Sequence, residues 1–307
     1  MSALAVSTHW IAFRHDDGSA LADEINSAGF QAVELGYDTR PELVPGLRAA
    51  CADGRIRCAS VHNTCPVPDG IPKGHPEWFL LASLDPAEQQ AAIHHTLNSA
   101  RFAASIGART VVTHAGNVQM RAFTPKLSRC YTHGKCGTAR YDRLRAKANA
   151  ARQVAAPRHF DALCKALDSL LPELEKIQVT IALENLPSLE AIPTIEEQAE
   201  LFHRFPSPCL QYWHDFGHGQ ILQNLGIAPS LSRLRRFGNR TAGVHIHDTD
   251  SVSDSHSMPP LEGGVAWEHV VPLIQPEWTL VLEPAIATPL ESLQQARRFL
   301  QNLLSTS

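Results

Sequence analysis

The sequence predicts a single (β/α)8 barrel, and three observations support this fold class. Eight short apolar or β-branched segments recur along the 307 residues. The stretches between them are long enough for helices, and many carry the apolar spacing of a helix. Several of the apolar segments end on a carboxylate or an imidazole, and barrel enzymes keep their functional side chains at the carboxyl ends of their strands.

Each element follows from its local pattern. We expect strands at residues 4–8, 31–35, 57–62, 110–114, 178–184, 209–214, 242–247 and 279–283, where the short apolar runs lie. We expect helices at residues 19–27, 86–106, 159–175, 194–204, 267–274 and 289–304. Asp85-Pro86 precedes an acidic first turn, which satisfies free amide groups and opposes the helix dipole. Because strands and helices alternate throughout, we expect one barrel domain over residues 1–307.

The composition is that of a globular protein that acts on a small molecule. Hydrophobic residues make up 44% and charged residues 19%, and no apolar stretch is long enough to cross a bilayer. A formal net charge of −4 gives no overall attraction to nucleic acid or to anionic membranes. The first residues lack the pattern of a secretory signal, and the seven cysteines are scattered, so we expect reduced thiols and a cytoplasmic protein.

Two connections are unusually long, and both follow strands, so in a barrel both would lie on the functional face. The first, at about residues 117–158 after the fourth strand, carries ten Lys or Arg residues against one acidic residue, Asp142. Such a basic insertion could hold a substrate phosphate, or it could be a solvated helix face that contacts another subunit. The second, at about residues 249–267 after the seventh strand, carries Asp254 and His256 and is expected to be a loop that bears ligands.

Four residues that end apolar runs in the second half of the chain are candidate metal ligands: Glu184, Asp215, His245 and Glu283. Three carboxylates at close range repel one another, whereas a divalent cation neutralises them. One His with three carboxylates suits Mn²⁺, Co²⁺, Zn²⁺ or Mg²⁺. Any one of them alone could be a structural polar residue, but four strand ends in register predict one metal site.

The segments around these residues resemble the xylose isomerase-like barrel superfamily. The resemblance covers nearly the whole chain and is carried by Leu183-Glu184-Asn185, His214-Asp215-Phe216-Gly217-His218, His245-Ile246-His247-Asp248 and Leu282-Glu283-Pro284. The superfamily includes sugar phosphate isomerases and epimerases, inosose dehydratases, tagatose and psicose 3-epimerases and endonuclease IV. The resemblance implies a divalent metal bound by Glu184, Asp215, His245 and Glu283, with His245 preferred over His247.

The same resemblance implies a reaction. It predicts an isomerase or epimerase of a sugar, sugar phosphate or polyol, in which Glu184 and Glu283 move a proton through a metal-stabilised enediolate. It also implies that His218 faces the substrate or a second ion. Glu34 lies where some members place a glutamate that contacts the substrate, although Glu34 could equally be a plain strand-end carboxylate. The partner expected is therefore a small carbohydrate, with neither nucleic acid nor membrane favoured, and barrels of this family often form homo-oligomers.

A different set of residues supports another interpretation. His62, His114, His218, Asp254 and His256 resemble additional ligands of the three-zinc site of endonuclease IV, which would make the protein a multi-zinc phosphoesterase. Leu186-Pro187-Ser188 departs from the Gly-containing turn of that nuclease, and in sugar-acting relatives similar residues contact substrate hydroxyls. A lyase like inosose dehydratase and a carbohydrate-binding barrel without activity remain further alternatives.

Overall fold

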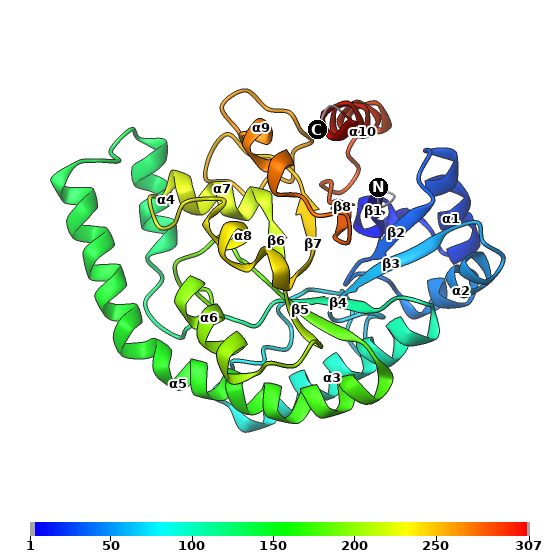
Figure 1. Cartoon of the computed structure of the whole chain (residues 1–307), viewed down its shortest axis with the longest axis horizontal. Coiled ribbons are helices and arrows are strands. Elements are labelled where there is room, and N and C mark those ends of the chain that lie inside the picture. Colours follow the sequence, from blue (N-terminus) through cyan, green and yellow to red (C-terminus); the bar gives the residue numbers. More distant parts are fainter. Residues whose placement is uncertain (1–3, 306–307) are drawn as a thin grey trace.

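The computed structural model describes residues 4–305, in which eight parallel strands form a closed barrel. The strands pair in chain order, and pairing of the first with the last closes the barrel. They are β1 (Ala5–Ser7), β2 (Ala32–Leu35), β3 (Arg57–His62), β4 (Thr110–Thr113), β5 (Thr180–Glu184), β6 (Leu210–Asp215), β7 (Thr241–Ile246) and β8 (Thr279–Leu282). Figure 1 shows helices around the outside of these strands. The predicted (β/α)8 barrel is confirmed, and each predicted strand overlaps an observed one.

The helices follow the strands around the barrel. They are α1 (Gly18–Ser27), α2 (Val44–Ala52), α3 (Pro86–Ser105), α4 (Thr124–Thr132), α5 (Ala139–Ile177), α6 (Ile195–Arg204), α7 (Phe216–Asn224), α8 (Ser232–Phe237), α9 (Trp267–Val270) and α10 (Leu290–Ser305). The predicted helices at 19–27, 86–106, 194–204 and 289–304 match α1, α3, α6 and α10 closely. Within residues 4–305, none of the helices has both the length and the apolar character needed to cross a bilayer.

The basic segment at 117–158 is largely helical, because α4 and the first half of α5 occupy it. The sequence predicted a helix only from residue 159, since Pro157 is a residue that usually begins or breaks a helix. In the structure α5 continues through Pro157 and also through Pro172. The two helices share a small apolar cluster with α7 and the segment after β5, formed by Phe123, Leu127, Tyr141, Ala148, Leu189, Ile221 and Leu225. The segment is therefore a packed helical hairpin.

The inside of the barrel is filled by side chains from six strands. Trp213 is the one large residue of this cluster, which also contains Ala5, Ala32, Val112, Ala182 and Val281. Gly243 on the neighbouring strand leaves room for the indole, since a Cβ there would lie 2.5 Å from its ring. The Trp213 ring also packs against the imidazole of His245, with ring centroids 5.1 Å apart. The barrel is thus closed below the strand ends, and a polar site can form only above Trp213.

A buried ion pair fastens the long helix α5 to the start of α6. Arg152 donates to both carboxylate oxygens of Glu197 at 2.8 Å, and also to the backbone carbonyls of Leu189 and Ala191. Glu197 forms a capping box with Thr194 at the first turn of α6. Burial opposes ionisation of Glu197, but the hydrogen bonds and charge of Arg152 outweigh it and lower the pKa of the carboxyl. This pair holds the segment that follows β5.

Glu197→Gln is expected to destabilise the fold by about 1–3 kcal/mol at pH 7, because it leaves Arg152 buried without its charge partner. The pKa of Glu197 is lowered in the folded state, so its stabilisation is present above the unfolded-state value and is lost as the pH falls through the folded-state value. Urea unfolding at pH 7 and at pH 4 measures the difference. Glu196→Gln is the matched control, because this neighbouring carboxylate is exposed. Equal effects of the two substitutions at pH 7 would contradict the prediction.

Candidate metal centre

Four carboxyl ends of strands bring three carboxylates and one imidazole together. Glu184 ends β5, Asp215 ends β6, His245 lies at the end of β7, and Glu283 directly follows β8. Asp215 and His245 are direct neighbours in the register of their two strands. One ligand atom from each of the four residues lies within 4.8 Å of the others, and all four side chains are buried. Closure of the barrel therefore brings together the four residues that the sequence predicts as metal ligands.

The three buried carboxylates of this group need a nearby positive charge to compensate their own negative charge. His245 Nδ1 lies 3.2 Å from Glu184 Oε1 and 3.2 Å from Glu283 Oε2. Burial opposes protonation of His245, but the carboxylates of Glu283, Glu34 and Glu184 raise its pKa well above the ordinary value. Burial likewise opposes ionisation of Glu184, yet the charges of His245 and His114 hold its pKa well below the ordinary value. A divalent cation would neutralise the same carboxylates, so the donor set fits a metal.

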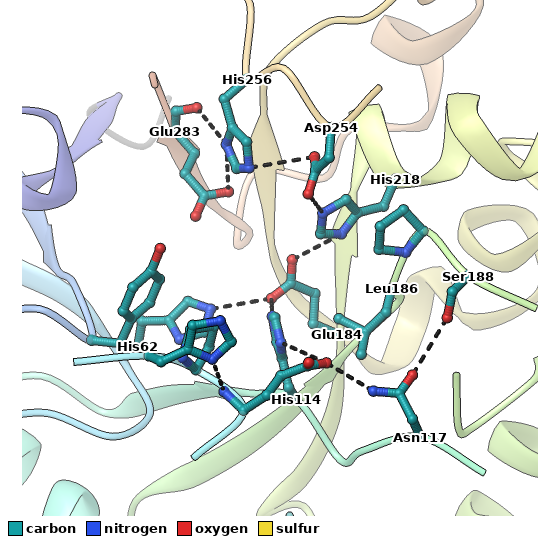
Figure 2. Close-up of a pocket in the computed structure, with 15 residues that line it drawn as sticks. His62, His114, Asn117, Glu184, Leu186, Ser188, His218, Asp254, His256 and Glu283 are labelled. Carbon is teal, nitrogen blue, oxygen red and sulfur yellow. Dashed lines mark hydrogen bonds and ion pairs between the residues drawn. The ribbon is translucent and has the colours of Figure 1, made fainter. Parts of the chain in front are cut away.

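A second group forms around the same glutamate. His62 Nε2 and His114 Nε2 lie 3.3 Å and 3.2 Å from Glu184 Oε2. This oxygen is nevertheless buried without an aligned hydrogen bond to any residue of the described range 4–305. Two nitrogens that approach an oxygen closely without hydrogen-bond alignment are arranged as ligands around a common ion would be. Figure 2 shows Glu184 between these two histidines on one side and His218 on the other.

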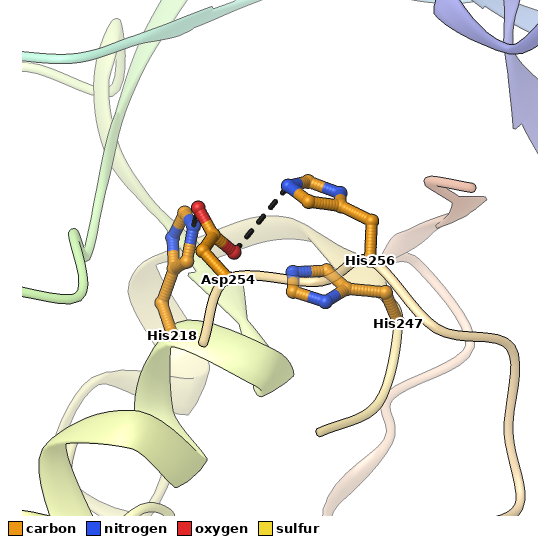
Figure 3. Close-up of side chains that lie close together, drawn as sticks. All are labelled: His218, His247, Asp254 and His256. Atoms are coloured by element: carbon orange, nitrogen blue, oxygen red, sulfur yellow. Dashed lines mark hydrogen bonds and ion pairs between the residues drawn. The ribbon is translucent and has the colours of Figure 1, made fainter. Parts of the chain in front are cut away.

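A third group lies beside the first two and consists of His218, His247, Asp254 and His256 (Figure 3). Asp254 Oδ2 lies 3.3 Å from His218 Nε2, and Asp254 Oδ1 lies 3.4 Å from His256 Nε2. Asp254 and His256 belong to the loop between β7 and α9, as the sequence predicted for a ligand-bearing loop. Asp248 shapes this loop, because its carboxylate accepts hydrogen bonds from the backbone of Leu261 and Val265 and from the indole of Trp267.

Backbone carbonyls orient three of the histidines. The Nδ1 atoms of His62, His218 and His256 hydrogen-bond to the carbonyl oxygens of Asn63, Asn185 and Glu283, at 3.0, 2.8 and 3.1 Å. Because a carbonyl only accepts, each Nδ1 donates, and Nε2 keeps its lone pair in a neutral ring. Metal-binding histidines are usually held in this way by a second hydrogen bond. The arrangement therefore suits ligation through Nε2 at all three positions.

Glu34 is the residue for which the sequence left two alternatives open. Its side chain is fully buried and is not part of the wall of the pocket beside the three groups. Glu34 Oε2 accepts from the Ser60 hydroxyl at 2.7 Å, and Glu34 Oε1 lies 2.9 Å from His245 Nε2. Of the two alternatives for Glu34, the geometry favours a buried strand-end carboxylate that contacts His245 and not the pocket. A register shift between Val33 and Glu34 in β2 accompanies this placement.

The three groups open into a pocket of about 440 Å³. It is lined by Tyr37, His62, His75, Pro76, Glu77, His114, Asn117, Glu184, Leu186, Pro187, Ser188, His218, Asp254, His256 and Glu283. None of the ten basic residues of segment 117–158 lines this pocket among the residues described. Arg145 and Arg152 are instead bound to backbone carbonyls. The geometry thus favours the alternative of a solvated helix face over a phosphate site for this segment.

Several residues of the site were missed by sequence reasoning. His247 joins the third group and hydrogen-bonds Asp215 at 2.9 Å, whereas the family resemblance implies His245 as the ligand and assigns His247 no role. Asn185 ties β5 to β6, since its side chain accepts from the Asp215 backbone and donates to the Asp215 carbonyl. Glu77 and Asn117 form part of the pocket wall. The adjacency of Asn185 to Glu184 was the only signal for these roles, because loop contacts follow from packing.

Comparisons with known proteins agree with this architecture. A family model described as a xylose isomerase-like TIM barrel matches residues 22–303. The structure is similar to that of a D-tagatose 3-epimerase-like protein, with TM-score 0.68, 16% identity, and 99% and 97% of the two chains covered. It is similar to an L-ribulose 3-epimerase, with TM-score 0.70, 14% identity, and 100% and 95% covered.

Two further similarities complete the comparison. A 3-keto-D-glucoside 4-epimerase of E. coli gives TM-score 0.66 and 14% identity, with 99% and 100% of the two chains covered. An uncharacterized protein of Sinorhizobium fredii is 29% identical over 115 residues, which span 38% of this chain and 35% of that relative. At these identities, the solved structures show a shared fold.

Asp215→Asn is expected to weaken binding of the central metal ion by at least about tenfold, because an amide oxygen replaces a charged ligand. Competition for Mn²⁺ or Zn²⁺ against a chromophoric chelator measures the affinity. Asp250→Asn is the matched control, since Asp250 is exposed and belongs to none of the three groups. Unchanged affinity in Asp215→Asn would mean that the ion is not held by the strand-end group.

Proposed function

Because the chain belongs to the xylose isomerase-like TIM barrel family, we propose that it is a metal-dependent enzyme that isomerises or epimerises a sugar or polyol. The observation that carries the proposal is the buried group of Glu184, Asp215, His245 and Glu283 at the edge of a pocket of small-molecule size. The names of the similar structures, which include an L-ribulose 3-epimerase and a 3-keto-D-glucoside 4-epimerase, support a carbohydrate substrate.

The pocket wall supports a substrate rich in hydroxyl groups. Asn117 donates to Glu77 at 2.9 Å, and Ser188 donates to Asn117 at 3.4 Å, so donors and acceptors alternate along one side. Leu186 and Pro187 give a neighbouring apolar surface that suits the C–H face of a sugar. Burial and the charge of Glu283 raise the pKa of Tyr37, which keeps its hydroxyl protonated at the opposite wall.

Glu283 is the base that we propose for proton transfer. It lines the pocket, and its Oε2 atom has no aligned hydrogen bond within residues 4–305. Glu184 was predicted to share this role, but four imidazoles approach its two oxygens, against two that approach Glu283 Oε2, so Glu184 is less accessible to a substrate. A divalent ion held by the strand-end group would supply Lewis acidity that stabilises negative charge on a substrate oxygen. Glu283 could then remove the proton of the carbon next to the carbonyl. Delivery of that proton to the former carbonyl carbon isomerises the sugar, whereas epimerisation needs a second proton donor on the opposite face, for which Glu184 is the candidate.

Exchange of substrate hydrogen with solvent tests the reaction. Ketopentoses and ketohexoses are incubated in D2O with the protein and Mn²⁺, Co²⁺, Mg²⁺ or Zn²⁺, and NMR measures deuterium next to the carbonyl. We expect incorporation with at least one ketose, and a loss of about 10²- to 10⁴-fold in Glu283→Gln. Glu277→Gln, which changes an exposed carboxylate, is the control and should retain activity. Full activity of Glu283→Gln would remove the proposed base.

A multi-zinc phosphoesterase is a second candidate, and a specific observation favours it. The residues of the second and third groups, His62, His114, His218, Asp254 and His256, gather around the central group, and Glu184 belongs to two of the three groups. A carboxylate shared by two groups can bridge two ions, and multinuclear sites activate water for attack on phosphate esters. Such a site needs few Lys or Arg side chains to bind the phosphate, because the metal ions themselves hold it.

Ion count and substrate separate the two candidates. Elemental analysis of protein saturated with metal is expected to give one ion per chain for the isomerase or epimerase. Two or three zinc ions per chain, together with cleavage of DNA that contains an abasic site and no turnover of any ketose, would replace the first candidate with the second. His62→Gln should lower the count by one ion in the second case and leave it unchanged in the first.

A further inference from the structure

A second chamber lies directly beside the metal pocket and shares a wall with it. Its volume is about 690 Å³, larger than the 440 Å³ of the metal pocket. Tyr37 and His75 line both cavities, so a ligand in one lies next to the other. The chamber is built by the segments after β1, β2, β3 and β8, whereas the metal ligands come mainly from β5 to β8. The substrate proposed above leaves this space unexplained.

The rim of the chamber exposes two large apolar side chains. Phe13 is 49% exposed and Ile286 is 46% exposed, although most large apolar residues of this protein are buried. They come from opposite ends of the chain and line the same cavity because β1 pairs with β8. Trp10 Nε1 donates to the Thr288 carbonyl at 2.7 Å, and Ala287 donates to the Trp10 carbonyl at 3.0 Å. These bonds hold both side chains at the opening.

The other walls are apolar, ring-rich and fixed. Val67, Pro68, Ile71 and Pro72 belong to the segment between β3 and α3. This segment is tied down by a hydrogen bond from the Val67 amide to the Thr39 carbonyl at 2.9 Å. Gly74 packs so closely on Tyr37 that a Cβ would lie 2.0 Å from the Tyr37 carbonyl oxygen. The chamber is therefore a formed surface that needs no rearrangement to accept a ligand.

Most polar groups of the inner wall have partners, and Asp38 Oδ1, which has none within residues 4–305, is itself buried. His9 Nδ1 lies 2.8 Å from Asp38 Oδ2, and Tyr37 Oη lies 3.3 Å from His9 Nε2. Arg40 is paired with Asp16 and with the His15 carbonyl. Glu42, Asp69 and Lys73 are exposed residues that reach water. The surface left for a ligand is thus formed by rings and aliphatic groups, which favours an aromatic substituent.

We infer that the substrate has two parts: a polar carbohydrate part at the metal pocket, and an aromatic substituent that lies in the chamber between Phe13, Ile286 and Val67. The inference deepens the proposed function and rests on its carbohydrate substrate. Continuity of the two cavities through Tyr37 and His75 supports one ligand across both. Covering the exposed apolar side chains would supply binding energy that a free sugar cannot obtain.

Pairs of glycosides that differ only in the substituent test this inference. Phenyl and methyl glycosides of glucose, galactose and xylose are titrated against the metal-loaded protein, and calorimetry gives the ratio of their Kd values. We expect phenyl to bind about tenfold more tightly than methyl for at least one sugar. Phe13→Ser and Ile286→Ser should each lower this ratio by at least about threefold without changing the Kd of the methyl glycoside.

Val154→Ser is the matched control, because Val154 is 83% exposed on α5 and lines neither cavity. Equal binding of phenyl and methyl glycosides would overturn the inference, and so would equal ratios in Phe13→Ser and Val154→Ser. Turnover of a ketose together with equal binding of phenyl and methyl glycosides would support the proposed reaction and exclude the role of the chamber in substrate binding. A preference for phenyl glycosides that depends on Phe13 and Ile286, with no deuterium exchange in any ketose, would support binding of an aromatic group in the chamber and contradict the proposed reaction.

Discussion

The buried carboxylate of Glu184 is the constraint around which the site is built. Four imidazoles lie within 3.4 Å of its two oxygens, from His62, His114, His218 and His245. A carboxylate removed from water must be compensated by charge or hydrogen bonds. Here the compensation comes from strands β3 and β7, from the residue that follows β4, and from α7. The buried glutamate thus contacts histidines from four separate segments of the barrel and requires them to keep their positions.

Much of the surrounding structure holds the ligands in place. Asp215 caps α7 by accepting from the His218 amide at 2.7 Å, so a single carboxylate begins a helix and faces the site. Glu34 and Ser60 fix His245 from behind, and Trp213 supports its ring from within the barrel. Such outer contacts fix ligand direction, on which metal affinity depends. The four residues of the strand-end group are thus held by several contacts, and separate hydrogen bonds hold the segments that line the apolar chamber.

The sequence predicted the side chains whose place depends on their position in a strand. It did not predict the contacts that are decided by tertiary packing. Glu184, Asp215 and Glu283 could be placed because a residue at the end of a buried strand must face the barrel rim. Glu34 lies at a similar strand end, but its side chain contacts His245 inside the barrel, and such contacts across the barrel interior are decided by packing. Helix α7 was missed because Phe216-Gly217-His218-Gly219 has a low helix propensity, and the cap from Asp215 compensates for it.

The central claim is that a divalent ion lies among Glu184, Asp215, His245 and Glu283. The most direct measurement is anomalous X-ray diffraction from crystals grown with Mn²⁺ or Zn²⁺, recorded above and below the absorption edge of the metal. The account predicts an anomalous peak bounded by these four side chains. An empty strand-end group in crystals that bind the ion elsewhere, with His245 still in contact with Glu184 and Glu283, would contradict it.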